Sequence, residues 1–214
     1  MSIYDEFNNN PYGSQVKVIE LIGNNKKVLE IGCASGRISK RLFENGCTVI
    51  GVEIDKNSSL KARKFCQDII TADIEYLEDL GYPSNYFDVI LLSNVLEHLR
   101  SPLNVLKKLK NYLKTDGYIV IAVPNIANIM IRTKLLLGKF EYEESGILDK
   151  THLRFFNEKS AKELLNKAGF SIIKFDIVPS IPLLSINSKI EYAIAKIRPN
   201  LFSMEFLMVG RLKE

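Results

Sequence analysis

Residues 28–37 read Val28-Leu29-Glu30-Ile31-Gly32-Cys33-Ala34-Ser35-Gly36-Arg37, and this stretch decides the fold class. It begins as a short apolar strand and turns through small residues. It then continues into a segment whose apolar positions have helical spacing up to Gly46. Small residues allow the backbone to approach a ligand closely, and the N-terminus of the following helix offers unpaired N–H groups. The stretch therefore predicts a strand–turn–helix unit with a ligand at the turn.

Strand-like and helix-like segments alternate along the rest of the chain. Strands are expected at 47–52, 68–71, 87–92, 118–123, 170–178 and 203–212, and helices at 57–65, 102–113, 125–139, 157–168 and 186–197. Several of these strands are apolar on both faces, which is typical of a parallel sheet covered by helices on both sides. The predicted fold is a doubly wound α/β fold with a mostly parallel sheet. We expect a single domain over residues 1–214, with an inserted helix and loop at about 125–155.

Composition and charge exclude several classes of protein. Basic residues exceed acidic ones by 29 to 25 and are scattered, so the sequence predicts no nucleic-acid partner. No apolar run approaches the roughly 18 residues that a membrane span needs, and Met1–Glu6 is too polar for a secretory leader. We therefore expect a cytoplasmic protein without stable membrane insertion, either a monomer or a homodimer. The few cysteines and histidines lack zinc-ligand spacing, so reduced thiols and no metal are expected.

The turn after the first strand favours one type of ligand over another. A dinucleotide fingerprint needs G-x-G-x-x-G, but Gly32 and Gly36 are four residues apart and Ala34 lies between them. Glu30, two residues before the first glycine, would repel a pyrophosphate and attract a cation. S-adenosylmethionine (SAM) has no phosphate and carries a positive sulfonium, so it suits an acidic turn.

Acidic residues also follow the next two strands. Glu53 ends the second strand, where a carboxylate can accept both hydroxyls of a ribose. Asp73 follows the third strand and is expected either to accept from an adenine amine or to cap a helix, while Ile74 packs on the ring. Asp55 and Glu97 are interpreted as turn or surface acids.

Taken in order, these features resemble the class I SAM-dependent methyltransferases. The resemblance rests on Glu30 through Gly36, Glu53, Asp73-Ile74 and Phe87 through Leu99, and it is greatest to the small-molecule branch that includes ubiquinone-biosynthesis enzymes. It implies a Rossmann-like sheet of seven strands with the last strand antiparallel, and SAM as cofactor. One departure is Ala34, where the family often has glycine.

The resemblance also implies roles for individual residues. The glycine turn lines the methionine part of SAM, Ser93 and Asn94 face the transferred methyl, and His98 lies at the mouth of the acceptor pocket. The full set of expected cofactor-binding residues is Glu30, Gly32, Cys33, Ser35, Gly36, Glu53, Ile54, Asp73, Ile74, Ser93, Asn94 and His98. His98 is also a candidate catalytic residue.

A second segment, Asp149-Lys150-Thr151-His152-Leu153-Arg154-Phe155-Phe156, resembles the D-x-x-H-x-R-x-F segment of methyltransferases of sugar and cell-surface polysaccharide biosynthesis. In it, His152 is a candidate general base and Arg154 a candidate clamp for an acceptor phosphate or carboxylate. Asn125, at the start of the insertion, is a further candidate for substrate contact. The alternative interpretation is that Asp149 and His152 only attach this loop to the sheet.

The sequence thus predicts transfer of a methyl group from SAM to an oxygen or nitrogen atom of a small molecule, with a nucleotide-sugar or polysaccharide precursor preferred. The [D/N]-P-P-[Y/F] sequence of nucleic-acid amine methylation is absent, since residues 93–96 read Ser-Asn-Val-Leu. The inserted helix is expected to act as a lid over the acceptor. Two alternatives are a nicotinamide-dependent oxidoreductase and a SAM-binding protein without catalysis.

Overall fold

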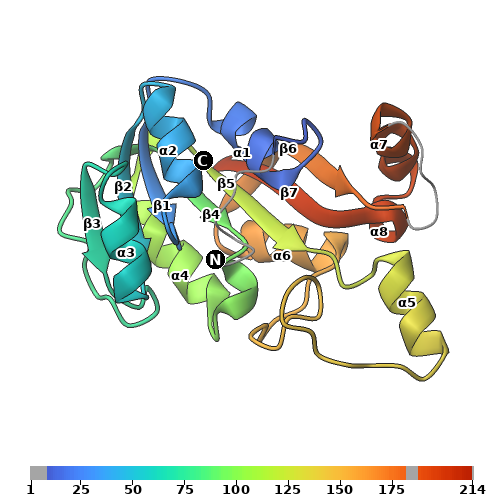
Figure 1. Cartoon of the computed structure of the whole chain (residues 1–214). Coiled ribbons are helices and arrows are strands. Elements are labelled where there is room, and N and C mark those ends of the chain that lie inside the picture. The colour runs from blue at the N-terminus through green and yellow to red at the C-terminus, as the bar shows by residue number, and fades with distance from the viewer. Residues whose placement is uncertain (1–8, 182–187, 214) are drawn as a thin grey trace.

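A seven-stranded sheet forms the centre of the computed structural model, which describes residues 9–181 and 188–213 (Figure 1). The strand order is β3-β2-β1-β4-β5-β7-β6, and β7 runs antiparallel to both of its neighbours. The other neighbouring pairs are parallel. The strands are β1 (Lys27–Ile31), β2 (Thr48–Glu53), β3 (Asp68–Thr71), β4 (Phe87–Ser93), β5 (Leu113–Pro124), β6 (Phe170–Pro179) and β7 (Ser203–Leu212). The predicted mostly parallel sheet with an antiparallel last strand is confirmed.

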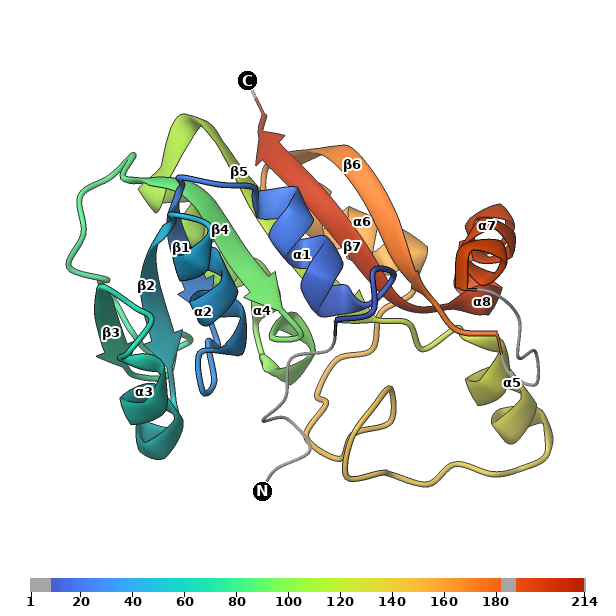
Figure 2. The same ribbon diagram turned by 45° about the horizontal axis from the view of Figure 1, so that its top comes forward.

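Helices cover both faces of this sheet, as the apolar strands predict. Figure 2 shows α1, α2 and α3 in front of the sheet and α4 and α6 behind it. The helices are α1 (Ser14–Ile22), α2 (Arg37–Glu44), α3 (Lys56–Ala62), α4 (Pro102–Leu109), α5 (Ile129–Leu136), α6 (Glu158–Lys167), α7 (Ser188–Ile197) and α8 (Pro199–Phe202), with short 3₁₀ helices η1 (Leu96–His98) and η2 (Lys110–Tyr112). Each face has its own apolar cluster, with Leu42 of α2 in one and Leu106 of α4 in the other.

Several predicted boundaries were wrong. The helix expected at 102–113 ends earlier, and Gly117 lies inside β5 rather than before it. The helix expected at 125–139 begins only at Ile129, because the Asn128 side chain caps it by accepting from the N–H of Met130 (2.8 Å). Helix α1 was not predicted at all. Of the helix expected at 186–197, residues 186 and 187 lie outside the described residues.

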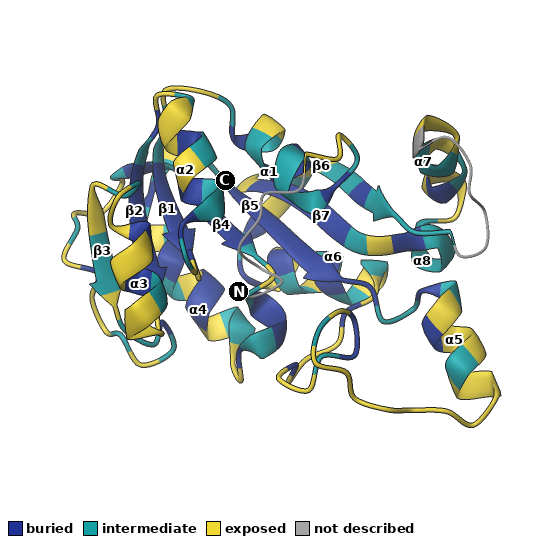
Figure 3. Ribbon diagram, viewed as in Figure 1, coloured by how far each residue is buried: buried dark blue, intermediate teal, exposed yellow. Residues whose placement is uncertain are grey.

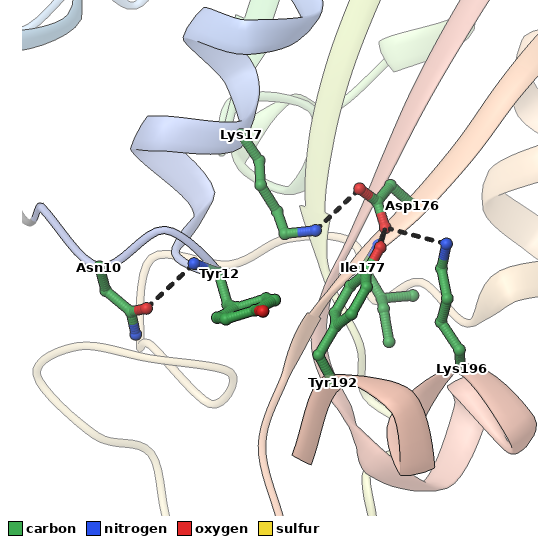
Figure 4. A network of polar contacts seen from close by, with 7 residues as sticks. All are labelled: Asn10, Tyr12, Lys17, Asp176, Ile177, Tyr192 and Lys196. Carbon is green, nitrogen blue, oxygen red and sulfur yellow. Dashed lines mark hydrogen bonds and ion pairs between the residues drawn. The ribbon is translucent and has the colours of Figure 1, made fainter. Parts of the chain in front are cut away.

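One network of polar contacts joins α1, β6 and α7 at the end of the sheet away from β3 (Figure 4). Lys17 Nζ lies 2.8 Å from Asp176 Oδ2 and is almost fully buried. The Tyr192 hydroxyl donates to Asp176 Oδ1 at 2.5 Å, and the Lys17 ammonium lies 4.0 Å from the centre of the Tyr192 ring. Because a buried charge needs a partner, this network fixes the positions of α1 and α7 relative to β6.

The inserted segment between β5 and α6 differs from the sheet in its exposure. In Figure 3 the central strands are mostly dark blue, whereas α5 and the loop after it are largely yellow. The insertion is tied to the sheet at its base, where Asn125 and Phe156 form a parallel bridge. None of the described helices is long and apolar enough to cross a membrane.

Candidate active site

A cleft of about 410 Å³ opens at the carboxyl ends of β1, β2 and β4. In open α/β sheets, ligands bind beyond this edge, and the volume is within the usual range for a small-molecule site. Seven residues that the sequence predicted for cofactor binding line this cleft: Gly32, Glu53, Ile54, Asp73, Ile74, Asn94 and His98. The remaining lining residues are Ile31, Val52, Ala72, Glu75, Val95 and Leu99.

The turn after β1 needs glycine at two positions. Gly32 has φ +68°, and a Cβ there would lie 2.7 Å from Cγ2 of Val95. Gly36 has φ +82°, and a Cβ there would lie 2.8 Å from the Cα of Ala62 in α3. Ala34 also adopts a left-handed conformation, with φ 47°, which is unfavourable for an L-residue. This turn is therefore tightly packed, against Val95 at Gly32 and against α3 at Gly36, and Gly32 is its residue that lines the cleft.

Glu53 links the ends of the first two strands. Its Oε2 accepts a hydrogen bond from the N–H of Ala34 (2.8 Å), and its Oε1 accepts from the N–H of Asp55 (2.9 Å). A carboxylate has about four lone-pair sites, so acceptor capacity remains for a ligand in the cleft. Asp55 itself caps α3 by accepting from the N–H of Ser58, so its interpretation as a turn acid is confirmed.

The loop after β3 also lines the cleft, through Ala72, Asp73, Ile74 and Glu75. Asp73 Oδ1 accepts from the N–H of Glu75 (2.9 Å) and shapes a turn, although no α-helix begins there. The Lys108 ammonium of α4 donates to the carbonyls of Ile74 and Leu77 and so holds this loop. Ile74 is buried, whereas Ile54 is 67% exposed beside Glu53. Two apolar side chains therefore flank the two acids, an arrangement suited to a nucleoside.

Glu30 does not line the cleft. Its side chain is buried and accepts a hydrogen bond from the hydroxyl of Ser39 on α2 (2.6 Å). Burial raises the pKa of Glu30 to about 8, so the group is largely uncharged at neutral pH. A negative charge on Glu30 therefore cannot be what excludes a pyrophosphate from the cleft. Cys33, Ser35 and Gly36 likewise belong to the turn but not to the lining of the cleft.

The segment after β4 brings polar groups to the same edge. Asn94 lines the cleft with φ 54°, a conformation that Asn tolerates better than most residues, and its amide donates to Glu205 of β7 (3.4 Å). Ser93, the last residue of β4, is half-buried and is not among the lining residues.

The chain then turns through η1, which contains Glu97, a residue that the sequence did not indicate as part of the site. Glu97 was interpreted as a turn or surface acid, but it is fully buried, and neither carboxyl oxygen has a hydrogen-bond partner on another described residue. The interpretation was wrong because η1 packs inward, with Leu96 and Leu99 in the core. Burial raises the pKa of Glu97 to about 8. The only signal in the sequence is the apolar residues around it in Leu96-Glu97-His98-Leu99.

The structure brings His152 to Glu97 and His98, although they are more than fifty residues apart in the chain. The two imidazole rings meet edge to face with centres 4.8 Å apart. One ligand-type atom from each of the three side chains lies within 4.8 Å of the others. The backbone carbonyl of Glu97 accepts from the N–H groups of Leu153 (2.8 Å) and Arg154 (2.9 Å), which fixes the loop against η1. Both predicted catalytic histidines thus belong to one cluster at the edge of the cleft.

Two other predicted substrate residues have contacts within the protein. Asn125 is fully buried, where its amide donates to the carbonyls of Asn200 (3.1 Å) and Ser203 (2.9 Å) and its oxygen accepts from Ala127. These bonds occupy the side chain, so the structure gives it a supporting position. Arg154 is exposed and donates to the carbonyl of Arg100 (2.5 Å). Its guanidinium retains other N–H groups.

Comparison with known proteins defines the class. A family model described as a methyltransferase domain matches residues 4–174. An uncharacterized protein of Methanocaldococcus jannaschii is 31% identical over 165 residues, covering 76% of this chain and 73% of that protein. The chain therefore belongs to the methyltransferase-domain family, and the predicted resemblance to SAM-dependent methyltransferases is confirmed. The alternative of a nicotinamide-dependent oxidoreductase is contradicted by this membership.

Several relatives carry the name ubiquinone biosynthesis O-methyltransferase. The one from Glaesserella parasuis is 32% identical over 47% of this chain and 46% of its own length. The mitochondrial protein of Arabidopsis thaliana is 34% identical over 67% of this chain and 49% of its own. This chain thus spans about half the length of these relatives.

Solved structures support the fold. A SAM-dependent methyltransferase of Archaeoglobus fulgidus has a TM-score of 0.63 at 23% identity, covering 92% of this chain and 91% of that one. An N-methyltransferase of Burkholderia thailandensis, whose structure holds S-adenosylhomocysteine and 1,6-didemethyltoxoflavin, has a TM-score of 0.62 at 17% identity, covering 96% and 78%.

Proposed function

We propose that this chain transfers a methyl group from SAM to an oxygen or nitrogen atom of a small molecule. The observation that carries the proposal is the single cleft in which Gly32, Glu53 and Asp73 lie together with His98. The glycine turn supplies a close backbone wall, and the two acids offer acceptors to a nucleoside. The apolar side chains of Ile54 and Ile74 offer surfaces on which an adenine ring can pack.

Methyl transfer depends mainly on the alignment of the acceptor atom, the methyl group and the sulfur. Methyl transfer from a sulfonium is an in-line displacement in which the acceptor lone pair forms a bond to carbon and the carbon–sulfur pair returns to sulfur. A hydroxyl acceptor must also lose its proton. The cluster of Glu97, His98 and His152 lies at the edge of the cleft and is the candidate group for activating it.

We further propose that the acceptor is a nucleotide sugar or a polysaccharide precursor. What supports this is the Asp149–Phe156 segment, which places Arg154 next to Arg100 beside the histidine cluster. Guanidinium groups bind phosphate in a bidentate manner. The inserted segment 125–155 is proposed to close over this acceptor as a lid, and a cytoplasmic location is part of the same proposal.

The test begins with binding. Titration calorimetry should show one equivalent of SAM or S-adenosylhomocysteine bound, and no binding of NAD. Absence of SAM binding would overturn the proposal. Transfer of labelled methyl from SAM is then measured on a panel of nucleotide sugars, oligosaccharides, phenols and amines. Binding without turnover on every acceptor would instead support a SAM-binding protein without catalysis.

The variant His152→Ala separates acceptor chemistry from cofactor binding. We expect lower turnover at saturating SAM with nearly unchanged SAM affinity, since His152 is not among the residues that line the cleft. A wild-type rate on the true acceptor would assign His152 to structure alone.

A further inference from the structure

We propose that Glu97, His98 and His152 bind one divalent transition-metal ion, of the Zn²⁺, Mn²⁺ or Fe²⁺ type, at the edge of the cleft. The inference deepens the proposed function, because it rests on the same cleft and assigns the group that activates the acceptor. Among the described residues, this is the one group of three acidic, thiol or imidazole side chains close enough together to share a cation.

The first observation is the state of Glu97. Its side chain is fully buried and both carboxyl oxygens lack a partner on another described residue. A buried carboxyl without a partner is costly, and native structures rarely tolerate one without a reason such as an ion. Salt bridges of this chain elsewhere pair their acids with lysine or arginine, as Asp176 is paired with Lys17.

The second observation is the hydrogen bonding of His152. Its Nδ1 lies 3.0 Å from the carbonyl oxygen of Ile147, which can only accept, so Nδ1 carries the proton. The lone pair is therefore on Nε2. Metal-binding histidines usually donate their other N–H to a carbonyl or carboxylate in this way, which fixes the ring and the tautomer.

The third observation is the same arrangement at His98. Its Nδ1 lies 3.1 Å from Oγ1 of Thr151 and 3.3 Å from the Thr151 carbonyl. The Thr151 hydroxyl donates to Asp149 at 2.6 Å, so its oxygen accepts from His98. This leaves the Nε2 lone pair of His98 unprotonated as well. The Asp149-Lys150-Thr151-His152 segment thus supplies one ligand and orients the other.

The donor set decides the type of ion. Two imidazole nitrogens and one carboxylate suit Zn²⁺, Mn²⁺ or Fe²⁺ and leave further coordination positions open, whereas Mg²⁺ and Ca²⁺ prefer oxygen ligands. The ligand atoms of the three side chains lie within 4.8 Å of one another, close to the separation that two metal–ligand bonds of about 2.0–2.2 Å span, so the three can converge on one ion.

Such an ion has a defined task in the proposed reaction. An acceptor hydroxyl bound to the ion loses its proton to water more readily, because the cation stabilises the alkoxide. The alkoxide pair then forms the new carbon–oxygen bond, and the carbon–sulfur pair neutralises the sulfonium. In this scheme the two histidines serve the acceptor by holding the cation, and do not take up the proton themselves.

Metal binding is tested directly, without SAM or acceptor. Chelator-treated protein is titrated with Zn²⁺ by calorimetry and with Co²⁺ by visible absorption. We expect one equivalent bound by the wild type, and at least tenfold weaker binding by Glu97→Gln and His152→Gln. Circular dichroism checks that each variant is folded. The control is Cys66→Ser, which removes a thiol outside the cluster and should leave binding unchanged.

Each outcome has a clear consequence. No stoichiometric binding by the wild type, or binding lost in Cys66→Ser but retained in Glu97→Gln, would overturn the site. Equal competition by Mg²⁺ would overturn the choice of ion. Because SAM affinity is measured separately on the same preparations, a metal site without SAM binding would refute the proposed function alone, and SAM-dependent turnover unaffected by chelation would refute the metal's role in it.

Discussion

The carboxylate of Glu53 accepts a hydrogen bond from the backbone N–H of Ala34, so the acid at the end of β2 holds the turn that follows β1. The same carboxylate lines the cleft. A residue expected to contact only a ligand therefore also shapes the wall against which the ligand binds.

Glu53→Ala should consequently affect both binding and stability. We expect SAM affinity to fall by about 1–3 kcal/mol and the free energy of unfolding to fall by about 1–2 kcal/mol, because two backbone N–H groups lose their acceptor. Calorimetry and urea denaturation measure the two effects, and Glu20→Ala, at an exposed position on α1, is the control. Unchanged SAM affinity would remove the ribose assignment.

Gly32→Ala should reduce SAM affinity more than tenfold, because the new Cβ would lie 2.7 Å from Cγ2 of Val95 at a positive φ. Two variants separate the causes. Gly23 also has a positive φ, but nothing lies within 4 Å of an added Cβ. The stability lost in Gly23→Ala therefore measures backbone strain without a clash. The double variant Gly32→Ala, Val95→Ala should recover part of the affinity. No recovery would show that the clash is not what lowers binding.

Ala34→Gly should stabilise the protein slightly. Relief of the left-handed conformation is worth about 1–2 kcal/mol, and the greater chain entropy of unfolded glycine offsets about 0.5–1 kcal/mol of it. Urea denaturation should therefore show a gain of about 0.5–1 kcal/mol with SAM affinity retained. A loss of stability would mean that the Ala34 methyl makes a contact that outweighs the strain.

Glu30→Gln should change how stability depends on pH. The pKa of Glu30 rises from 4.5 to about 8 on folding, so the folded state binds the extra proton between these values and wild-type stability falls as the pH rises through that window. The variant has no carboxyl group at this position, so its stability does not fall for this reason as the pH rises. Its melting temperature should exceed that of the wild type by several degrees at pH 9, with the difference shrinking toward pH 5. A difference independent of pH would mean that the carboxyl does not titrate there.

Asn125→Ala distinguishes a supporting residue from a substrate contact. The side chain makes three hydrogen bonds in a fully buried position, so we expect a loss of about 2–4 kcal/mol in the free energy of unfolding. At a temperature where the variant is folded, KM for the acceptor should stay within a factor of two. A large rise in KM alone would restore the substrate role.

The parts of the site that lie at the ends of strands were predictable from the sequence. Gly32, Glu53 and Asp73 each follow a strand whose apolar pattern is clear, and parallel strands bring such positions to one edge. The strands themselves were visible because burial on both faces removes polar residues from them.

The misassigned parts depend on contacts distant in sequence. Glu30 and Glu97 are acidic in sequence, yet the packing of α2 and η1 buries both. Asn125 looked available to a substrate until β7 and α8 supplied its partners. The grouping of His98 with His152 depends on the path of a loop of more than ten residues after α5, which no periodic pattern specifies.

Residues 137–142 form an exposed stretch between α5 and Glu143, and the backbone of Glu143 bridges to Asp149 in the segment that carries His152. Because the bridge of Glu143 lies between this stretch and His152, we expect changes within 137–142 to leave the spacing of His98 and His152 unaltered. Evolution can therefore vary the sequence of this stretch while the histidine cluster keeps its geometry.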